Sequence, residues 1–336
     1  MGSGSDGMSD PRVVKVIKDM AGPKAKNVLY LGTATYDLPN FAQRQTQHFF
    51  GSGDGNYNVS KLDLVHCSPS QYEIEESIGK ADIIVVGGGN TLYAIDRWKT
   101  LQHVIPALQA AKDRGAILTG GSAGAICWFD GGHSNAMDPE TYYAFRIQKF
   151  GIEGADYGDE SSSSSSQQDW KYIRVPGLGF LPGMVSPHLD RIQSNGVLRA
   201  YDFDRVLLQH PGEVGIGIDH WAALAVDGDD YQVISLHDKP GSVLLTEDGQ
   251  GQQAAMFSPD AKGVPGVWIK RVNTEKGIVE STLLPPTGKL SDYLSPAMSI
   301  VEDEKALAQC RRENPDVMRG RLTVQVSREI GRPGRS

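Results

Sequence analysis

Aliphatic runs alternate with longer amphipathic stretches along the first two-thirds of the chain. Uninterrupted apolar runs favour strands that are buried on both faces of a sheet. Four such runs occur, at residues 27–31, 62–65, 82–86 and 116–119. Strand signals that alternate with helical signals predict an α/β fold, with a mostly parallel sheet and helices on both of its faces.

The clearest helical period lies between residues 91 and 113. Apolar residues recur there at helical spacing: Leu92, Ile95, Trp98, Leu101, Ile105 and Leu108. The spacing predicts one helix packed on the sheet, with Pro106 as a kink or a break and Gly115 at its end. The run at 13–17 predicts another helix near the N-terminus.

Shorter apolar runs predict further strands after residue 170. They lie at residues 172–175, 214–218, 222–226, 232–236, 267–269 and 278–280. Gly228-Asp229-Asp230 predicts a turn. The serine run at 161–166 cannot bury apolar area, so it predicts a mobile surface loop at 159–168. A helix is expected at 302–311.

These patterns divide the chain into three parts. Residues 1–26 form a tail and a helix, with residues 1–7 expected to be an expression remnant or a disordered tail because they lack an apolar signal core. Residues 27–244 form the predicted catalytic α/β domain. Residues 245–336 form a C-terminal extension whose role the pattern leaves open.

Charge and cysteine content narrow the class of protein. The 336 residues carry a formal net charge of −8, which argues against non-specific nucleic-acid binding. No apolar run approaches the roughly 18 residues that a membrane span needs. The three cysteines, Cys67, Cys127 and Cys310, imply no disulfide framework and favour a cytoplasmic protein. A homo-oligomer is left open, and no metal or cofactor is expected.

Gly120-Gly121-Ser122-Ala123-Gly124 directly follows the last of the four aliphatic runs. A Gly-x-Ser-x-Gly turn between a strand and a helix is typical of a nucleophile elbow, which exposes a serine hydroxyl at the end of a sheet. The Ala123 amide would then lie where it can stabilise an oxyanion. The alternative is a glycine-rich loop that binds phosphate or only turns the chain.

Gly87-Gly88-Gly89-Asn90 ends the third aliphatic run. No nucleotide-binding glycine pattern is present. The amides of Gly88 and Gly89 are therefore predicted to form the other half of an oxyanion hole, facing Ala123. An inert tight turn is the alternative.

A serine nucleophile needs a base, and the base needs a partner that orients it. His188 is the best candidate base because Pro187-His188 ends a short apolar run, and the ends of strands are where open α/β sheets place ligands. His133 is instead expected on a surface loop. Asp219, at the end of a later strand, is the first candidate for the orienting acid. Asp190 and His220 are its rivals.

Four motifs in this order resemble the peptidase E (aspartyl dipeptidase) and cyanophycinase family of serine peptidases. They are Val85-Val86-Gly87-Gly88-Gly89-Asn90-Thr91, Gly120-Gly121-Ser122-Ala123-Gly124-Ala125, Pro187-His188-Leu189-Asp190-Arg191 and Gly217-Ile218-Asp219. The resemblance implies a fold like the class I glutamine amidotransferases and a Ser-His-acid triad with Ser122 and His188. The family often has an acidic residue where this chain reads Asp219-His220, so the third member stays open.

The resemblance implies hydrolysis of short peptides with an aspartyl preference, or of β-aspartyl polymers as in the cyanophycinases. Asn90, Asp138 and Arg191 are candidate substrate-binding residues, because an acidic side chain calls for a cation and a free amine for a carboxylate. A catalytically silent member that binds a small molecule or a partner is the rival hypothesis. An amidotransferase is disfavoured because those enzymes use a cysteine, and Cys127 lies off the elbow.

Overall fold

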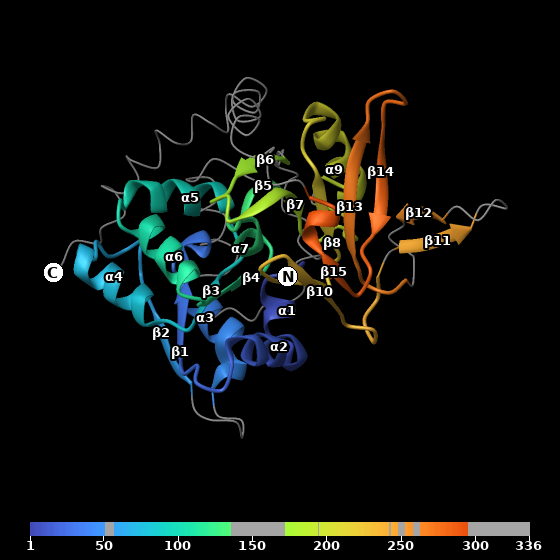
Figure 1. Ribbon diagram of the computed structural model, residues 1–336. Helices are drawn as coiled ribbons and strands as arrows, with labels where there is room; N and C mark the ends of the chain where they lie inside the picture. The colour runs from blue at the N-terminus through green and yellow to red at the C-terminus, as the bar shows by residue number, and fades with distance from the viewer. Residues whose placement is uncertain are drawn as a thin grey trace.

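A parallel four-stranded sheet forms the first half of the protein (Figure 1). The computed structural model describes residues 1–50, 57–135, 172–193, 195–241, 243–247, 253–257 and 263–294. The strand order of this sheet is β2-β1-β3-β4. The strands are β1 (Asn27–Leu31), β2 (Asn58–Lys61), β3 (Ile83–Val86) and β4 (Ile117–Gly120). The predicted α/β class with a mostly parallel sheet is confirmed.

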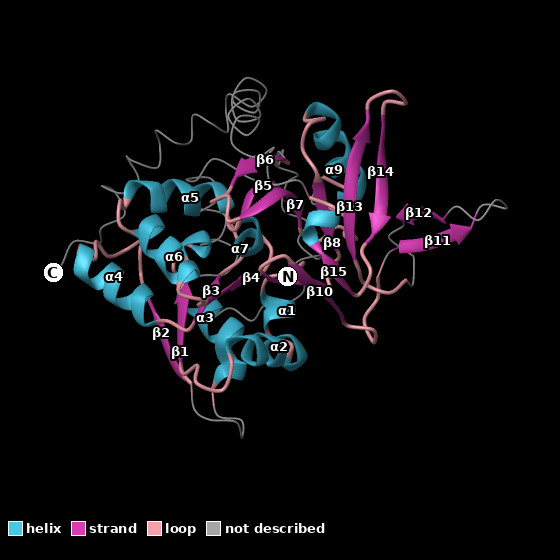
Figure 2. Ribbon diagram, viewed as in Figure 1, coloured by secondary structure: helices cyan, strands magenta, loops and turns pink. Residues whose placement is uncertain are grey.

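Helices cover both faces of this sheet (Figure 2). On one face lie α4 (Gln71–Lys80), α5 (Thr91–Thr100) and α6 (Val104–Asp113), and on the other lie α2 (Pro11–Ala21) and α3 (Pro39–Thr46). Leu29 and Leu31 pack with the first group, whereas Val28 and Tyr30 pack with the second. Successive side chains of a strand point to opposite faces, so one short apolar run supplies two cores.

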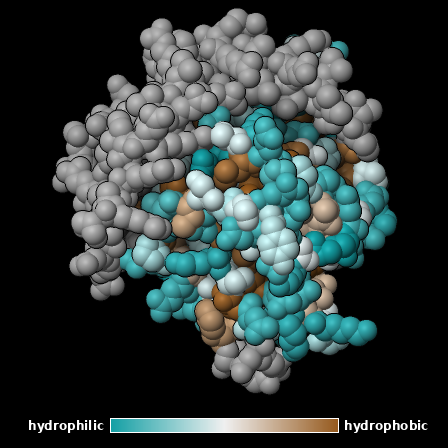
Figure 3. Space-filling view, turned by 90° about the vertical axis from the view of Figure 1, so that its left-hand side faces the viewer, coloured by the Kyte–Doolittle hydropathy of each residue, from teal (hydrophilic) through white to brown (hydrophobic). Residues whose placement is uncertain are grey.

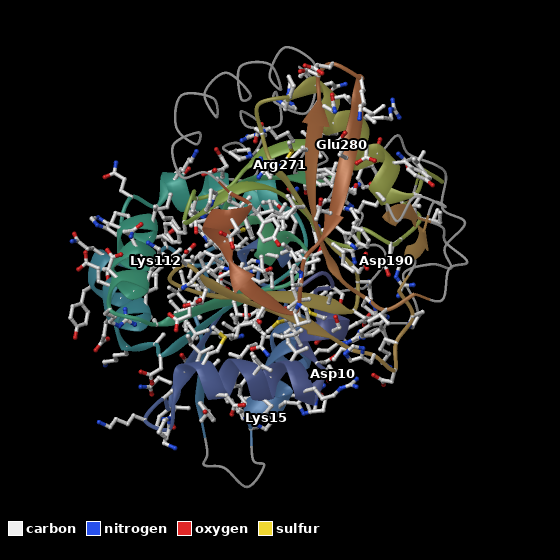
Figure 4. All side chains as sticks on the ribbon, turned by 45° about the vertical axis from the view of Figure 1, so that its right-hand side comes forward. Asp10, Lys15, Lys112, Asp190, Arg271 and Glu280 are labelled. Atoms are coloured by element: carbon white, nitrogen blue, oxygen red, sulfur yellow. The ribbon has the colours of Figure 1, made fainter. Side chains whose placement is uncertain are left out.

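The helices begin where local sequence signals place them. Asp10 caps α2 by accepting a hydrogen bond from the Arg12 amide, and Pro11 follows at the first helical position. Ser70 and Glu73 form a reciprocal capping box at the start of α4. The outer side of α2 carries the exposed Lys15 (Figure 4).

A six-stranded mixed sheet forms the second half, in the order β14-β13-β8-β7-β5-β6. Its strands are β5 (Phe129–Ser134), β6 (Ile173–Pro176), β7 (Leu181–Ser186), β8 (Gly215–Ile218), β13 (Val267–Asn273) and β14 (Ile278–Leu283). The short helix α7 (Ala123–Ile126) connects β4 to β5, and α9 (Arg199–Gln209) packs on β13 and β14. β13 pairs with β8, so this part of the predicted extension 245–336 belongs to the same sheet as β8.

Smaller elements complete the described chain. They are α1 (Ser5–Met8), β9 (Ala222–Asp227), β10 (Asp230–Ser235), β11 (Val243–Glu247), β12 (Gln253–Phe257) and β15 (Thr287–Lys289). β9 and β10 form a hairpin, to which β15 adds. The face in Figure 3 is largely hydrophilic over its described part, with small hydrophobic areas between. No helix within the described ranges is long and apolar enough to cross a bilayer.

Two predicted elements differ in the structure. The single helix expected over 91–113 is two helices, α5 and α6, because Pro106 lacks an amide hydrogen and is tolerated in the first turn of a new helix. The second strand lies at Asn58–Lys61 rather than at 62–65, where Leu62 and Leu64 instead pack in the core. The expected loop 159–168, the helix 302–311 and Cys310 lie outside the described residues.

The expectation that residues 1–7 form a disordered tail is wrong. Residues 1–4 are buried, and the N-terminus lies at the centre of the molecule, near β4 and β10 (Figure 1). The Gly2 amide donates to the Ala222 carbonyl, and the Met8 side chain is fully buried with Val13 and Phe41. Backbone hydrogen bonds and one apolar anchor hold the segment, which its polar composition did not reveal.

Close glycine packing joins the turn after β4 to the end of β3. A Cβ added to Gly124 would lie 2.1 Å from the Val86 carbonyl oxygen, and one added to Gly120 would lie 2.8 Å from the same atom. Both distances are shorter than any tolerated contact. Only glycine therefore lets α7 approach β3 closely enough to hold this turn in place.

We expect Gly124→Ala to lower the free energy of unfolding by about 2 kcal/mol or more, because the methyl group would meet backbone that cannot move aside. Gly79→Ala is the matched control, since Gly79 lies in α4 with no atom within 4 Å of an added Cβ. The control should gain about 0.5–1 kcal/mol. Denaturant titration of the two variants measures both values, and equal stabilities would contradict the packing argument.

Candidate active site

Ser122 stands at a strained turn between β4 and α7. Its backbone has φ 55° and ψ −122°, a conformation that residues with a side chain rarely adopt. The carbonyl of Ser122 accepts hydrogen bonds from the Ala125 and Ile126 amides, which start α7. A strained serine between a strand and a helix is the geometry predicted from Gly-x-Ser-x-Gly.

The glycine turn after β3 lies beside Ser122. A Cβ added to Gly88 would lie 3.3 Å from the Ser122 Cβ. Gly89 has φ 134° and packs against the Ala34 carbonyl, so it also requires glycine. Among the described residues, neither the Gly88 nor the Gly89 amide donates a backbone hydrogen bond. Both amides are thus candidate donors to an anionic oxygen.

His188 follows β7, and His220 follows β8. The two strands are parallel neighbours, so their carboxyl ends bring these two residues to one edge of the sheet. His188 has φ 54°. Its Nδ1 lies 3.0 Å from the His220 Nδ1, and the His220 Nε2 lies 3.2 Å from a carboxylate oxygen of Asp6. A hydrogen-bonded chain therefore runs from Asp6 through His220 to His188.

The proton positions in this hydrogen-bonded chain follow when Asp6 is ionised and His220 is neutral. An ionised Asp6 only accepts hydrogen bonds, so the His220 Nε2 carries a hydrogen. Neutral His220 then accepts at Nδ1, and His188 must donate from its own Nδ1. The Nε2 of His188 is left with a lone pair. This tautomer is the one that a general base needs in order to take a proton from serine.

The surroundings of His188 keep it neutral. Burial lowers its pKa well below the ordinary 6.5, and the positive charges of Arg199 and Arg191 lower it further. A neutral imidazole accepts a proton, whereas a charged one does not. The pKa of Asp6 is lowered by its hydrogen bond to His220, which keeps its carboxylate ionised at neutral pH.

Asp219 and Asp190 lie beside the hydrogen-bonded chain of Asp6, His220 and His188. Within the described residues, neither carboxylate has a hydrogen bond to the His188 ring. The Asp219 carboxylate accepts a hydrogen bond from the Gly266 amide at 2.9 Å, and it is fully buried. Burial, followed by the charge of Asp190, raises the pKa of Asp219 well above its usual range. Asp190 accepts a hydrogen bond from the His220 amide at 2.6 Å. Asp190, which Figure 4 labels, thus positions the backbone of His220.

The two candidate catalytic residues contact the same short piece of chain. The Ser122 amide donates to the Met1 carbonyl at 3.3 Å, and the His188 amide donates to the Gly2 carbonyl at 3.2 Å. Consecutive Cα atoms are about 3.8 Å apart, so Ser122 and His188 flank one dipeptide unit. Within the described ranges, no hydrogen bond joins the Ser122 hydroxyl to His188.

Cations surround the Asp6 carboxylate. Arg44 of α3 forms an ion pair with it at 2.8 Å, and the charge of Arg191 also lowers its pKa. Sequence reasoning selected Arg191 but missed Arg44, because no motif marks a residue on a distant helix. Arg174 is buried and paired with Glu213 at 2.8 Å.

Asn90 and Asp138 were both predicted to bind substrate, and the structure describes only the first of them. The Asn90 side chain is fully buried, caps α5 by accepting from the Tyr93 amide, and donates to the Tyr36 hydroxyl. Its polar groups thus bind the protein itself. Asp138 lies outside the described residues. Among the described residues, no group of three or more acidic, histidine or cysteine side chains is placed to hold a metal ion.

A second serine–histidine–aspartate cluster is formed by residues of β5, β7 and α9. His133 was expected on a surface loop, yet it is fully buried on β5. Its ring lies 3.2 Å from the Ser186 hydroxyl and 3.1 Å from the Asp202 carboxylate. Burial lowers the pKa of His133 to about 4. Ser186 and His133 are fully buried, so this cluster ties β5, β7 and α9 together behind His188.

Comparison with known proteins places this geometry in a family. A sequence model of peptidase family S51 matches residues 1–234, which include Ser122, His188 and His220. The chain belongs to peptidase family S51. It is therefore a serine peptidase, and the family expected from the four motifs is confirmed.

Two individual relatives of this S51 peptidase have sequence identities of 27% and 32% over the aligned residues. It is 27% identical over 267 residues to a protein of Trypanosoma brucei brucei named G2/mitotic-specific cyclin-1, covering 74% of this chain and 77% of that protein. It is 32% identical over 165 residues to the uncharacterized peptidase YgaJ of Bacillus subtilis (strain 168), covering 48% of this chain and 54% of that protein.

A solved structure also matches this S51 peptidase. A crystal structure described as a peptidase E protein from Listeria monocytogenes EGD-e aligns with a TM-score of 0.45 at 14% identity. The alignment covers 69% of this chain and 95% of that chain.

Proposed function

We propose that this serine peptidase hydrolyses short peptides with an acidic residue, using Ser122 as nucleophile and His188 as general base. The observation that carries the proposal is the pair of contacts to Met1 and Gly2, which puts the strained serine and the neutral histidine on either side of one peptide unit. A substrate peptide in that place would present its carbonyl carbon to both residues.

The reaction follows from this placement. The Ser122 hydroxyl oxygen attacks the scissile carbonyl carbon while its proton passes to the His188 Nε2. The amides of Gly88, Gly89 and Ala123 stabilise the oxyanion, at about 3 kcal/mol for each well-placed donor. The C–N bond then breaks, and His188 returns the proton to the leaving amine. Water, activated by the same histidine, hydrolyses the acyl-serine and restores the enzyme.

His220 is the third member in this proposal. It is the residue whose ring contacts the His188 ring, and its tautomer leaves the His188 Nε2 free to accept a proton. Asp219 is less suited to the role, because its carboxylate binds the Gly266 amide and its raised pKa favours the neutral form. Where the family often has an acidic residue, this chain would thus use His220, whose ring is oriented by the Asp6 carboxylate.

The acidic preference rests on the site that Asp6 occupies. A carboxylate there has the Arg44 guanidinium at 2.8 Å, the His220 ring at 3.2 Å and the charge of Arg191 nearby. Charge-assisted contacts of this kind recognise a carboxylate strongly. An aspartyl dipeptide and a β-aspartyl peptide share this carboxylate chemistry. A panel holding both substrate types distinguishes dipeptidase from cyanophycinase-like activity.

We expect Ser122→Ala to abolish labelling by a fluorophosphonate probe and to lower kcat by at least about 10³-fold. Ser186→Ala is the matched control, because Ser186 also contacts a histidine but is fully buried. That variant should still be labelled at Ser122. In-gel detection and mass spectrometry of the labelled peptide measure both results. Labelling that survives Ser122→Ala would refute the assignment of the nucleophile.

We expect His220→Phe to lower kcat/KM by about 10²- to 10⁴-fold, because His188 loses the acceptor that fixes its tautomer. Asp219→Asn should lower it less than about tenfold, since an amide oxygen can still accept from Gly266. A larger loss in Asp219→Asn would make Asp219 the third member.

The acidic limb of the wild-type pH profile of kcat/KM should lie below pH 6.5, because a depressed pKa keeps His188 unprotonated there.

We expect Arg44→Met to lower the ratio of kcat/KM for an aspartyl dipeptide to that for its alanyl analogue by about 10-fold or more. The ratio is the proper measure, because any general change in the cleft affects both substrates alike. Arg12→Met is the control, since Arg12 pairs with Asp10 and Asp238 on the surface. An unchanged ratio in Arg44→Met would remove this arginine from substrate recognition.

A further inference from the structure

Residues 1–4 run through the candidate active site in the manner of a bound peptide. The Met1 nitrogen donates to the Gly120 carbonyl at 3.2 Å, and the Met1 carbonyl accepts from the Ser122 amide. The Gly2 amide donates to Ala222 at 2.9 Å, and its carbonyl accepts from His188. Main-chain groups on both sides of the segment thus hold it as they would hold an added strand.

The segment also lies in van der Waals contact with the proposed nucleophile and against the backbone beside it. A Cβ added to Gly4 would lie 3.6 Å from the Ser122 Cβ and 3.7 Å from the Gly88 Cα. A Cβ added to Gly121 would lie 2.0 Å from the Ser3 carbonyl oxygen. The segment therefore lies against both the proposed nucleophile and the glycine turn that is expected to bind the oxyanion.

Two further contacts fasten the segment beyond Gly4. Asp6 binds Arg44 and His220 through its carboxylate. Met8 inserts a fully buried side chain into the cluster that contains Val14 and Phe41. The carboxylate thus lies among the same cations that would recognise an acidic substrate.

We propose that residues 1–8 are a tethered peptide that occupies the substrate cleft of this peptidase and competes with acidic peptides for it. The inference rests on the proposed function. The Ser122 and His188 amides, the Ala222 carbonyl and the cations around Asp6 hold either the segment or a substrate. An incoming acidic peptide displaces the segment, and its carboxylate takes the place of Asp6 beside His220.

The test loosens the segment without touching catalytic side chains. A Cβ at Gly2 would lie 1.9 Å from the Asp219 carbonyl oxygen, and Asp219 is fixed by two hydrogen bonds to Gly266. Gly2→Ala must therefore shift the segment. Gly79→Ala, in an open position of α4, is the control. If Gly2→Ala fails to fold, Gly7→Ala serves in its place, because its Cβ would meet the Met1 side chain at 2.1 Å.

Binding is measured in a Ser122→Ala background, so that no substrate is turned over. We expect Gly2→Ala to bind an aspartyl dipeptide at least fivefold more tightly than the Gly79→Ala control. A synthetic peptide with the sequence of residues 1–8 should compete with the dipeptide on the Gly2→Ala protein. In the protein with an unchanged segment, saturating dipeptide should speed hydrogen exchange at the Gly2 and Gly7 amides.

The outcomes separate this inference from the proposed function. Equal dipeptide affinity in the two variants, or binding that leaves exchange at Gly2 and Gly7 unchanged, overturns the tethered competitor and leaves the peptidase mechanism intact. No dipeptide binding to either variant overturns the proposed substrate class and, with it, this inference. Tighter binding in Gly2→Ala, with faster exchange on dipeptide addition, supports it.

Discussion

The close approach of glycine backbone at Gly120 and Gly124 to the Val86 carbonyl is the constraint on which the site depends. It lets α7 start directly after β4, which forces Ser122 into a positive φ. The same packing brings the glycine turn after β3 to within contact of the Ser122 Cβ. The positive φ of Ser122 and its contact with the glycine turn therefore share one origin, and a single methyl group would disturb both.

Neighbouring strands and hydrogen bonds, rather than glycine packing, position the two histidines of the site. Two parallel strands, β7 and β8, bring His188 and His220 together, and the Asp6 carboxylate contacts the other ring nitrogen of His220. The carboxylates next to His220 in sequence or space serve the backbone instead, since Asp190 holds the His220 amide and Asp219 holds Gly266. An acid that is merely close to a histidine does not necessarily orient it. The residue whose side chain contacts a ring nitrogen is the better candidate for that role.

The sequence predicts the parts of this protein that local pattern controls. Aliphatic runs located β1, β3 and β4, and Gly-x-Ser-x-Gly located the elbow, because each reflects contacts within a few residues. Pro106 predicted a kink or a break, but the break lies before it at residues 101–103, and the proline stands in the first turn of α6. Arg44, Asp6 and the burial of His133 come from contacts between distant segments, and no local pattern carries that information.

Residues 1–4 also bear on how the molecule assembles. Gly2 pairs with Ala222, a partner 220 positions later in the chain (222 − 2), and the strand that carries this partner belongs to a hairpin completed still later by β15. Contacts of such long range form slowly, because loop closure must be achieved before they stabilise the fold. The Gly2–Ala222 hydrogen bond cannot form before residue 222 is in place, so the final position of residues 1–4 depends on the second half of the protein.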